Sequence, residues 1–317
     1  MVTAAAFIVA LLASMLLTPV VRGAARDAGL LDEPEARKVH EVPIPRLGGV
    51  AIVAAIYLGI AAALVAARAT DLPLALESGH LPAILVGSAL IAGVGTFDDL
   101  QGMRALVKLV AQVVIALTAF GLGLSIDRLA GPWGSVDLGI WSLPLTVAWM
   151  VAVINAVNLI DGLDGLASGV ALTAIGAFIV IGLLFGGADP ILPVLAAGAG
   201  GILGFLRYNL YPASIIMGDT GSMLLGFLLA AVGISLTQPG VSVPPWIPVI
   251  AVGLPLGDMA WAVVRRLVAG APVFEPDRRH IHHLLLAGGL SHRMAMLVLS
   301  GLSALLGVIA VGLAAVG

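Results

Sequence analysis

Residues 155–165 read NAVNLIDGLDG and lie where one long apolar run, 143–159, gives way to another, 167–186. The polar residues of this stretch recur at every third position, whereas an α-helix needs about 3.6 residues for each turn. A continuous helix would therefore turn Asn155 and Asp164 toward opposite faces. Because one regular helix cannot present the whole polar set to a single site, the stretch predicts a break between two helices.

Two glycines, Gly162 and Gly165, supply that break, because glycine allows backbone conformations that other residues avoid. We expect Asn158 to end one helix, and Asp161 and Asp164 to lie on a tight turn that leads into the next. Irregular backbone at membrane depth is tolerated only where protein buries it or where it lines a cavity. The turn is therefore expected to border a site.

The composition is that of an integral membrane protein. Of the 317 residues, 60% are hydrophobic and 10% are charged, and the mean hydropathy is +1.13. A soluble domain carries about 25% charged residues, so the composition excludes a soluble enzyme. The sequence contains no cysteine, which excludes a disulfide framework, a thiolate nucleophile and a thiolate zinc site.

Apolar runs near the length that crosses a bilayer fill most of the chain, and they predict about ten transmembrane helices. The expected fold is an all-α polytopic membrane protein, with a single domain over residues 1–317. The runs are 4–21, 47–67, 82–97, 105–121, 143–159, 167–186, 190–206, 221–236, 246–264 and 294–316.

The basic residues predict which loops face the cytoplasm. Threading these spans places 13 of the 15 Lys and Arg on one side of the membrane, and only Arg68 and Arg128 on the other. Because Lys and Arg accumulate in cytoplasmic loops, both termini are expected to be extracytoplasmic. In the outer segment 122–142, a short interfacial hairpin and an irregular loop are both compatible with the sequence. The cytoplasmic segments are 22–46, 98–104, 160–166, 207–220 and 265–293.

Acidic residues gather on this predicted cytoplasmic side. Asp98 and Asp99 follow the third run, and Asp219 precedes the eighth. A carboxylate costs roughly 2.5–3.5 kcal/mol near the middle of a membrane helix, so an apolar chain keeps several of them for a use. Clustered acids suggest a divalent cation, and such a cation suggests phosphate chemistry. Solvated loop acids are the plainer interpretation, and Asp219, Thr220 or Ser222 could equally cap a helix.

Two further ionisable residues lie within apolar runs. Lys108 is about one turn inside its run, from which it can reach the interface or bind a diphosphate as a point charge. Asp258 follows Pro255, which is expected to kink the run 246–264. A structural contact within the helix bundle is the default interpretation for Asp258.

The last predicted cytoplasmic loop combines arginines with histidines. Three histidines could bind zinc, but two adjacent arginines would repel the metal, so a phosphate or diphosphate clamp is the more natural interpretation. A basic loop held by anionic lipids is the alternative. The residues are Arg278, Arg279, His280, His282 and His283.

Five motifs, spread from about residue 37 to 293, together resemble those of the polyprenyl-phosphate N-acetylhexosamine-1-phosphate transferase family. In chain order they are His40…Pro45-Arg46-x-Gly48-Gly49, Asp98-Asp99, Asn155-x-x-Asn158-x-x-Asp161-Gly-x-Asp164-Gly, Met217-Gly218-Asp219-x-Gly221-Ser222 and His280-x-His282-His283. The last motif is most similar to that of the bacterial undecaprenyl-phosphate N-acetylglucosamine-1-phosphate transferases. Phospho-N-acetylmuramoyl-pentapeptide transferases, which usually carry three consecutive histidines there, are the alternative within the family.

The resemblance implies a cytoplasmic active site in a bacterial cytoplasmic membrane. It implies transfer of N-acetylglucosamine-1-phosphate from UDP-N-acetylglucosamine to undecaprenyl phosphate, with release of UMP, at the start of a cell-envelope glycan such as teichoic acid or O-antigen. It also implies dependence on Mg²⁺, with Mn²⁺ as a substitute, contact with membrane lipid and frequent homodimers. No nucleic-acid partner is expected.

The resemblance also implies roles for individual residues. Asn158 and Asp219 are expected to hold the metal, and the lipid is expected to lie beside the kinked run 246–264. A cation transporter is the alternative from another functional class, since transporters also carry intramembrane acids and broken helices. The expected catalytic residues are Asp98, Asp99, Lys108 and Asp161, and the expected substrate-binding residues are His40, Arg46, Asp164, Asn209, Arg278, Arg279, His280, His282 and His283.

Overall fold

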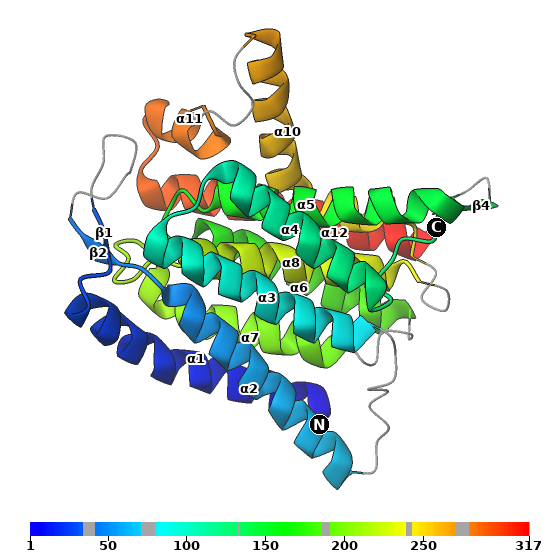
Figure 1. Cartoon of the computed structure of the whole chain (residues 1–317), viewed down its shortest axis with the longest axis horizontal. Helices are drawn as coiled ribbons and strands as arrows, with labels where there is room; N and C mark the ends of the chain where they lie inside the picture. The colour runs from blue at the N-terminus through cyan, green and yellow to red at the C-terminus, as the bar shows by residue number, and fades with distance from the viewer. Residues whose placement is uncertain are drawn as a thin grey trace.

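A computed structural model describes residues 1–33, 42–70, 80–131, 134–185, 191–238, 243–270 and 279–316. Helices occupy every predicted apolar run, so the all-α prediction is confirmed (Figure 1). The helices are α1 (Val2–Asp27), α2 (Gly48–Ala69), α3 (His80–Gln101), α4 (Ala105–Gly121), α5 (Ser142–Ile160), α6 (Leu166–Phe185), α7 (Leu192–Asn209), α8 (Gly218–Leu236), α9 (Trp246–Ala251), α10 (Gly253–Val268), α11 (Ile281–Ala287) and α12 (His292–Val316), with a 3₁₀ turn, η1, at Gly139–Trp141.

Within the described residues, seven helical segments are long and apolar enough to cross a membrane. The protein is therefore a multi-pass membrane protein. The remaining apolar helices are shorter or less hydropathic, such as α4 with its 17 residues. The number of ten spans stays a prediction. The seven segments are α1, α2, α3, η1 with α5, α6, α8 and α12.

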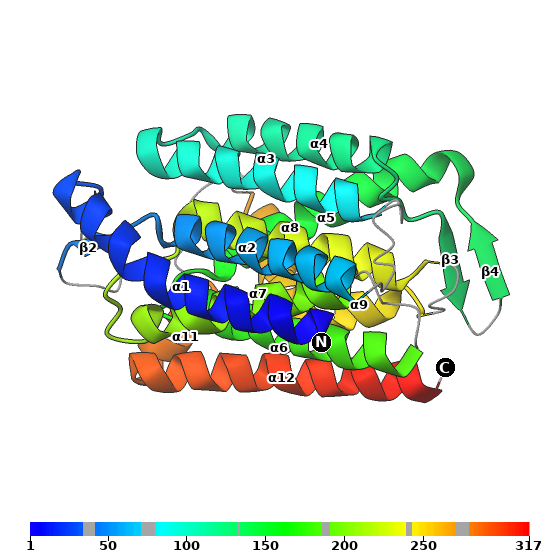
Figure 2. The same ribbon diagram turned by 90° about the horizontal axis from the view of Figure 1, so that it is seen from below.

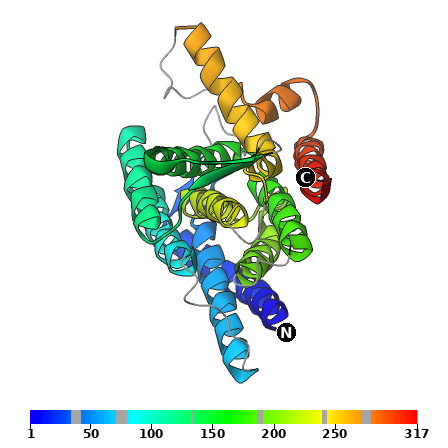
Figure 3. The ribbon, with the colours of Figure 1, turned by 90° about the vertical axis from the view of Figure 1, so that its right-hand side faces the viewer.

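The run 246–264 is broken rather than kinked. Helix α9 ends at Ala251, and α10 begins at Gly253. The sequence placed a bend at Pro255, but the interruption lies one turn earlier. Proline has no N–H to donate to the carbonyl four residues before it, and its ring clashes with that carbonyl, which here belongs to Ala251. As a result α10 leaves the bundle and projects to one side (Figures 1 and 3).

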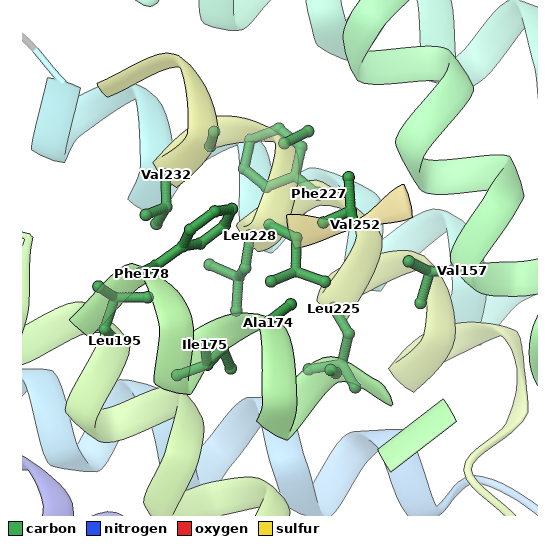
Figure 4. Close-up of a cluster of buried hydrophobic side chains, with 14 of the residues drawn as sticks. Val157, Ala174, Ile175, Phe178, Leu195, Leu225, Phe227, Leu228, Val232 and Val252 are labelled. Atoms are coloured by element: carbon green, nitrogen blue, oxygen red, sulfur yellow. The ribbon is translucent and has the colours of Figure 1, made fainter. Parts of the chain in front are cut away.

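Helix α8 lies at the centre of the bundle. Figure 3, which looks along the helices, shows the other elements around α8. In its most apolar stretch 94% of the residues are buried. A Cβ at Gly226 would lie 2.6 Å from the Cα of Ile154, so this glycine allows α8 to pack closely against α5. Figure 4 shows apolar side chains that surround this centre, including Phe178 of α6 and Phe227 of α8, both fully buried.

The two ends of the bundle carry different elements. Both termini lie at the end that also carries the strands β3 (Arg128–Gly131) and β4 (Gly134–Asp137), while β1 (Leu31–Asp32), β2 (Ile44–Pro45) and α11 lie at the other end (Figures 1 and 2). β3 pairs antiparallel with β4, and β1 with β2. A hairpin is therefore present inside the segment 122–142.

Candidate active site

The segment that joins β2 to α2 fixes the start of α8. The N–H of Gly49 donates to the carbonyl of Met217 over 2.8 Å, and the N–H of Ile216 donates to the carbonyl of Pro45 over 3.0 Å. A Cβ at Gly49 would lie 2.1 Å from the amide nitrogen of Gly221, so only glycine allows the two backbones to approach this closely. The Pro-Arg-x-Gly-Gly motif therefore positions the start of α8, which carries Asp219.

Asp99, at the end of α3, caps this start of α8. Its carboxylate accepts hydrogen bonds from the amide nitrogens of Asp219 (2.9 Å) and Thr220 (3.0 Å) and from the Thr220 hydroxyl (2.6 Å). A negative side chain at a helix N-terminus satisfies free N–H groups and interacts favourably with the helix dipole. The alternative in which Asp219, Thr220 or Ser222 caps α8 is not realised, because the capping carboxylate comes from another helix.

Four of the predicted residues meet beside this cap. The ammonium of Lys108, on α4, contacts the carboxylates of both Asp98 and Asp219. The amide nitrogen of Asn158, near the end of α5, donates to Asp219 over 2.8 Å and to the hydroxyl of Ser222 over 2.9 Å. Helices α3, α4, α5 and α8 thus bring two acids, a cation and an amide into direct contact.

A buried amide pair lies one helical turn deeper. The side chain of Asn155 donates to Gln112 over 2.5 Å, and Gln112 is fully buried. Gln112 lies four residues after Lys108 on α4, and Asn155 lies three residues before Asn158 on α5, so the pair joins α4 to α5 next to the site. Gln112 is not among the residues predicted from the sequence. A polar residue one turn from a lysine in an apolar helix is the signal that could have identified it.

The turn after α5 follows the prediction from its glycines. Helix α5 ends at Ile160, α6 begins at Leu166, and Gly165 has a φ of +76°, which disfavours any side chain. Asp161 directly follows α5. Burial, together with the negative charges of Asp219, Asp99 and Asp164, raises its pKa to about 8. Asp161 is therefore mostly protonated at neutral pH in the ligand-free protein.

Asp164 and Asn209 are engaged with the backbone of neighbouring segments. The carboxylate of Asp164 accepts from the N–H of Ala213 over 2.9 Å, and its own N–H donates to His292 over 3.0 Å. Asn209, 3% exposed, accepts from the N–H of Gly165 over 3.1 Å. Both side chains hold the turn against the loop before α8, a connection that sequence spacing does not reveal.

Histidines of the last predicted cytoplasmic loop lie over the same turn. His282 is 2% exposed, and a Cβ at Gly162 would lie 2.3 Å from its Nε2. Burial, together with the neighbouring His283 and His280, lowers the pKa of His282 to about 3. His282 is therefore neutral and supplies no positive charge to a phosphate clamp. The rings of His282 and His283 lie 4.2 Å apart, centroid to centroid.

Four other predicted residues are less closely tied to the cluster or fall outside the described part of the chain. Arg46 is partly buried, and its Nε has no hydrogen-bond partner among the described residues. The carbonyl of Arg279 accepts from the guanidinium of Arg265 over 3.1 Å. His40 and Arg278 lie outside the described residues.

The chemistry of the acid cluster suits a hard cation. Asp98 and Asp219 present carboxylate oxygens to one positive group, the ammonium of Lys108, and Asn158 adds an amide. Oxygen ligands of this kind are those that Mg²⁺ prefers. Within the described ranges, however, no three His, Asp or Glu side chains are arranged as a metal site. A divalent ion would therefore have to compete with Lys108 for the two carboxylates.

Comparisons with known proteins find relatives that match most of the chain. Residues 81–237 match the model of glycosyl transferase family 4. The chain is 39% identical to a probable undecaprenyl-phosphate N-acetylglucosaminyl 1-phosphate transferase of Bacillus subtilis, over 93% of this chain and 80% of the relative. It is 37% identical to the decaprenyl-phosphate N-acetylglucosaminephosphotransferase of Mycobacterium leprae, over 84% and 72%. It is 31% identical to the undecaprenyl-phosphate α-N-acetylglucosaminyl 1-phosphate transferase of Yersinia pestis, over 94% and 80%.

Proposed function

Because the chain belongs to glycosyl transferase family 4, the polyprenyl-phosphate N-acetylhexosamine-1-phosphate transferases, we propose that it transfers N-acetylglucosamine-1-phosphate from UDP-N-acetylglucosamine to undecaprenyl phosphate and releases UMP. The observation that carries this proposal is the contact between Asp98, Lys108, Asn158 and Asp219 at one end of the bundle. Carboxylates that hold a cation can place it against the negatively charged oxygens of a phosphate.

In the proposed reaction an oxygen of the lipid phosphate attacks the sugar-side phosphorus of the donor. The bond between this phosphorus and the bridging oxygen breaks, and UMP leaves with that oxygen and its negative charge. Such a reaction depends mainly on positioning and on neutralising charge. The lipid phosphate needs no strong base, because its second pKa is near 6 and it is largely ionised at pH 7.

The cluster provides the groups for this chemistry. Lys108 neutralises charge on the diphosphate. Asp98 contacts the ammonium of Lys108 and orients the lipid phosphate through it. Asp99 contributes by holding Asp219 in place through the start of α8. We assign Asn158 and Asp219 to a divalent ion, Mg²⁺ with Mn²⁺ as a substitute. When bound, this ion would add Lewis-acid stabilisation of the phosphoryl oxygens.

The donor is proposed to lie between the turn after α5 and the last cytoplasmic loop. The part of the site that binds uridine would be shaped by Asp161, Asp164 and Asn209. The two acids would face the uridine, and Asn209 would hold the turn in place. Basic and imidazole side chains would hold the diphosphate and the sugar, with His282 acting as a neutral hydrogen-bonding group. These side chains are His40, Arg46, Arg278, Arg279, His280, His282 and His283.

We further propose how the protein sits in its membrane. A single domain spans the bacterial cytoplasmic membrane, with the site on the cytoplasmic side and both termini extracytoplasmic. The shared position of the termini, at the end of the bundle opposite β1, β2 and α11, supports this orientation (Figure 2). The lipid acceptor would approach from the surrounding membrane lipid beside the break between α9 and α10. Homodimer formation remains part of the proposal.

An assay of UMP release tests the reaction and its alternatives. Purified protein is incubated with UDP-N-acetylglucosamine, with and without undecaprenyl phosphate and Mg²⁺, and UMP is quantified. We expect release only when both lipid and metal are present. Release only from UDP-N-acetylmuramoyl-pentapeptide would favour the peptidoglycan transferase. If no nucleotide sugar gave UMP, while vesicles that contain the protein took up cations, the transporter alternative would replace the proposal.

A further inference from the structure

Asp258 is a buried acid that the proposed chemistry does not use. It lies on α10, the helix that leaves the bundle, and is only 8% exposed. One carboxylate oxygen accepts from the N–H of Ile281 over 2.9 Å, and the other lies 2.8 Å from Nδ1 of His280. Both contacts join α10 to a segment more than twenty residues later in the chain. A buried carboxylate with two such partners holds that segment in a defined position.

The first contact caps helix α11. Ile281 is the first residue of α11, and His280, in an extended conformation, occupies the N-cap position without a side-chain cap of its own. Asp258 supplies the missing acceptor from another helix. With seven residues, α11 is too short to be stable as an isolated helix. Its position and direction therefore depend on contacts of this kind.

The second contact orients the imidazole of His280. A carboxylate beside Nδ1 requires the proton on that nitrogen, which leaves Nε2 for another partner. His280 is 5% exposed, and its ring lies 5.9 Å from that of His282 with only 5° between the ring planes. His282 in turn lies over Gly162, next to Asp161. A continuous set of contacts thus runs from Asp258 through two histidines to the turn after α5.

We propose that Asp258 is a positioning residue for donor binding. It touches no substrate itself. It fixes the tautomer of His280 and the start of α11, and so places the histidine loop, residues 279–283, where it can hold the diphosphate of the nucleotide sugar. This inference rests on the proposed function. A purely structural contact would affect both substrates, whereas Asp258 would affect the donor alone and would do so through His280.

A double-mutant cycle tests the inference on the purified full-length protein. The variants are Asp258→Asn, His280→Ala and the double variant, with Asp137→Asn, an exposed acid of β4, as the matched control. The measurements are kcat, KM for each substrate, calorimetric Kd for UDP as a diphosphate probe, and the unfolding temperature. We expect Asp258→Asn to raise the donor KM and the UDP Kd roughly tenfold or more, as for residues that orient a binding group. The lipid KM and the Asp137→Asn values should stay within about twofold of wild type.

The cycle separates positioning from stability. If Asp258 acts through His280, the double variant should bind UDP no more than about threefold more weakly than His280→Ala alone. Fully additive losses, equal losses for both substrates, or wild-type UDP binding by Asp258→Asn would overturn the inference. If Asp258→Asn unfolds, Asp258→Glu takes its place, and it must preserve UDP binding better than Asp258→Ala. A wild-type protein that binds UDP but releases no UMP would count against the proposed function and leave the UDP cycle to decide this inference.

Discussion

At the scale of single residues, several polar side chains act differently from what their sequence context suggests. Asp99, expected in the catalytic group, caps α8 and so holds Asp219. Asp258, whose default interpretation was a structural contact, reaches His280. The identity and approximate location of the polar cluster could be predicted from the sequence, because acids in apolar runs are rare. Their hydrogen-bond partners could not, since these bonds join helices 61 and 120 residues apart along the chain.

The protonation of Asp161 gives a testable pH dependence. Because its pKa is about 8, Asp161 is neutral at pH 7 and negatively charged at pH 9 in the ligand-free protein. A negative charge near the proposed uridine end repels UDP, whose terminal phosphate is already ionised above pH 7. We expect the UDP affinity of wild type, measured by calorimetry without divalent ions, to fall severalfold from pH 7 to pH 9. Asp161→Asn should remove most of this fall, and an equal fall in both proteins would contradict the assignment.

At the scale of the elements, the helices follow from apolar runs, but their mutual approach depends on particular glycines. The break between α9 and α10 could not be predicted from the sequence, because a proline in a long apolar run is compatible with either a kink or a full interruption of the helix. The turn between α5 and α6 was predictable, since polar residues at every third position do not fit one helix face.

Two glycines of α3 offer a matched pair of substitutions. A Cβ at Gly95 would lie 2.6 Å from the carbonyl oxygen of Asp219, whereas a Cβ at Gly93 meets nothing within 4 Å. Gly95→Ala should push α3 away from the start of α8, lower stability by about 1–3 kcal/mol, and reduce turnover at least as strongly as stability. Gly93→Ala should change neither. Thermal unfolding and UMP release measure both effects, and similar behaviour of the two variants would show that this helix contact is unimportant.

At the scale of the whole molecule, the start of α8, which carries the cluster around Asp219, lies at one end of the bundle, and both termini lie at the other (Figure 2). The distribution of Lys and Arg predicts the orientation in the membrane without any knowledge of helix contacts, because basic residues accumulate in cytoplasmic loops. The convergence of α3, α4, α5 and α8 on one site is a property of tertiary packing, which spacing along the sequence does not contain.

Cysteine labelling tests this orientation directly, since the sequence contains no cysteine. Ser135→Cys, exposed on β4, should react with a membrane-impermeant maleimide in intact cells. Ala287→Cys, exposed at the end of α11, should react only after the membrane is permeabilised. The reverse pattern, or labelling of both positions in intact cells, would invert or abolish the proposed topology.

The central claim is that the cluster around Asp219 carries out phosphoryl-sugar transfer to a lipid. The most direct test follows radiolabel from UDP-N-acetylglucosamine into undecaprenyl-linked product, with purified wild type, Asp219→Asn and the distant control Asp137→Asn at saturating Mg²⁺. We predict lipid-dependent product from wild type and Asp137→Asn, and a loss of roughly 100-fold or more in Asp219→Asn, as expected for a group that stabilises transition-state charge. Wild-type rates in Asp219→Asn, or no labelled lipid from the wild-type protein, would contradict the account.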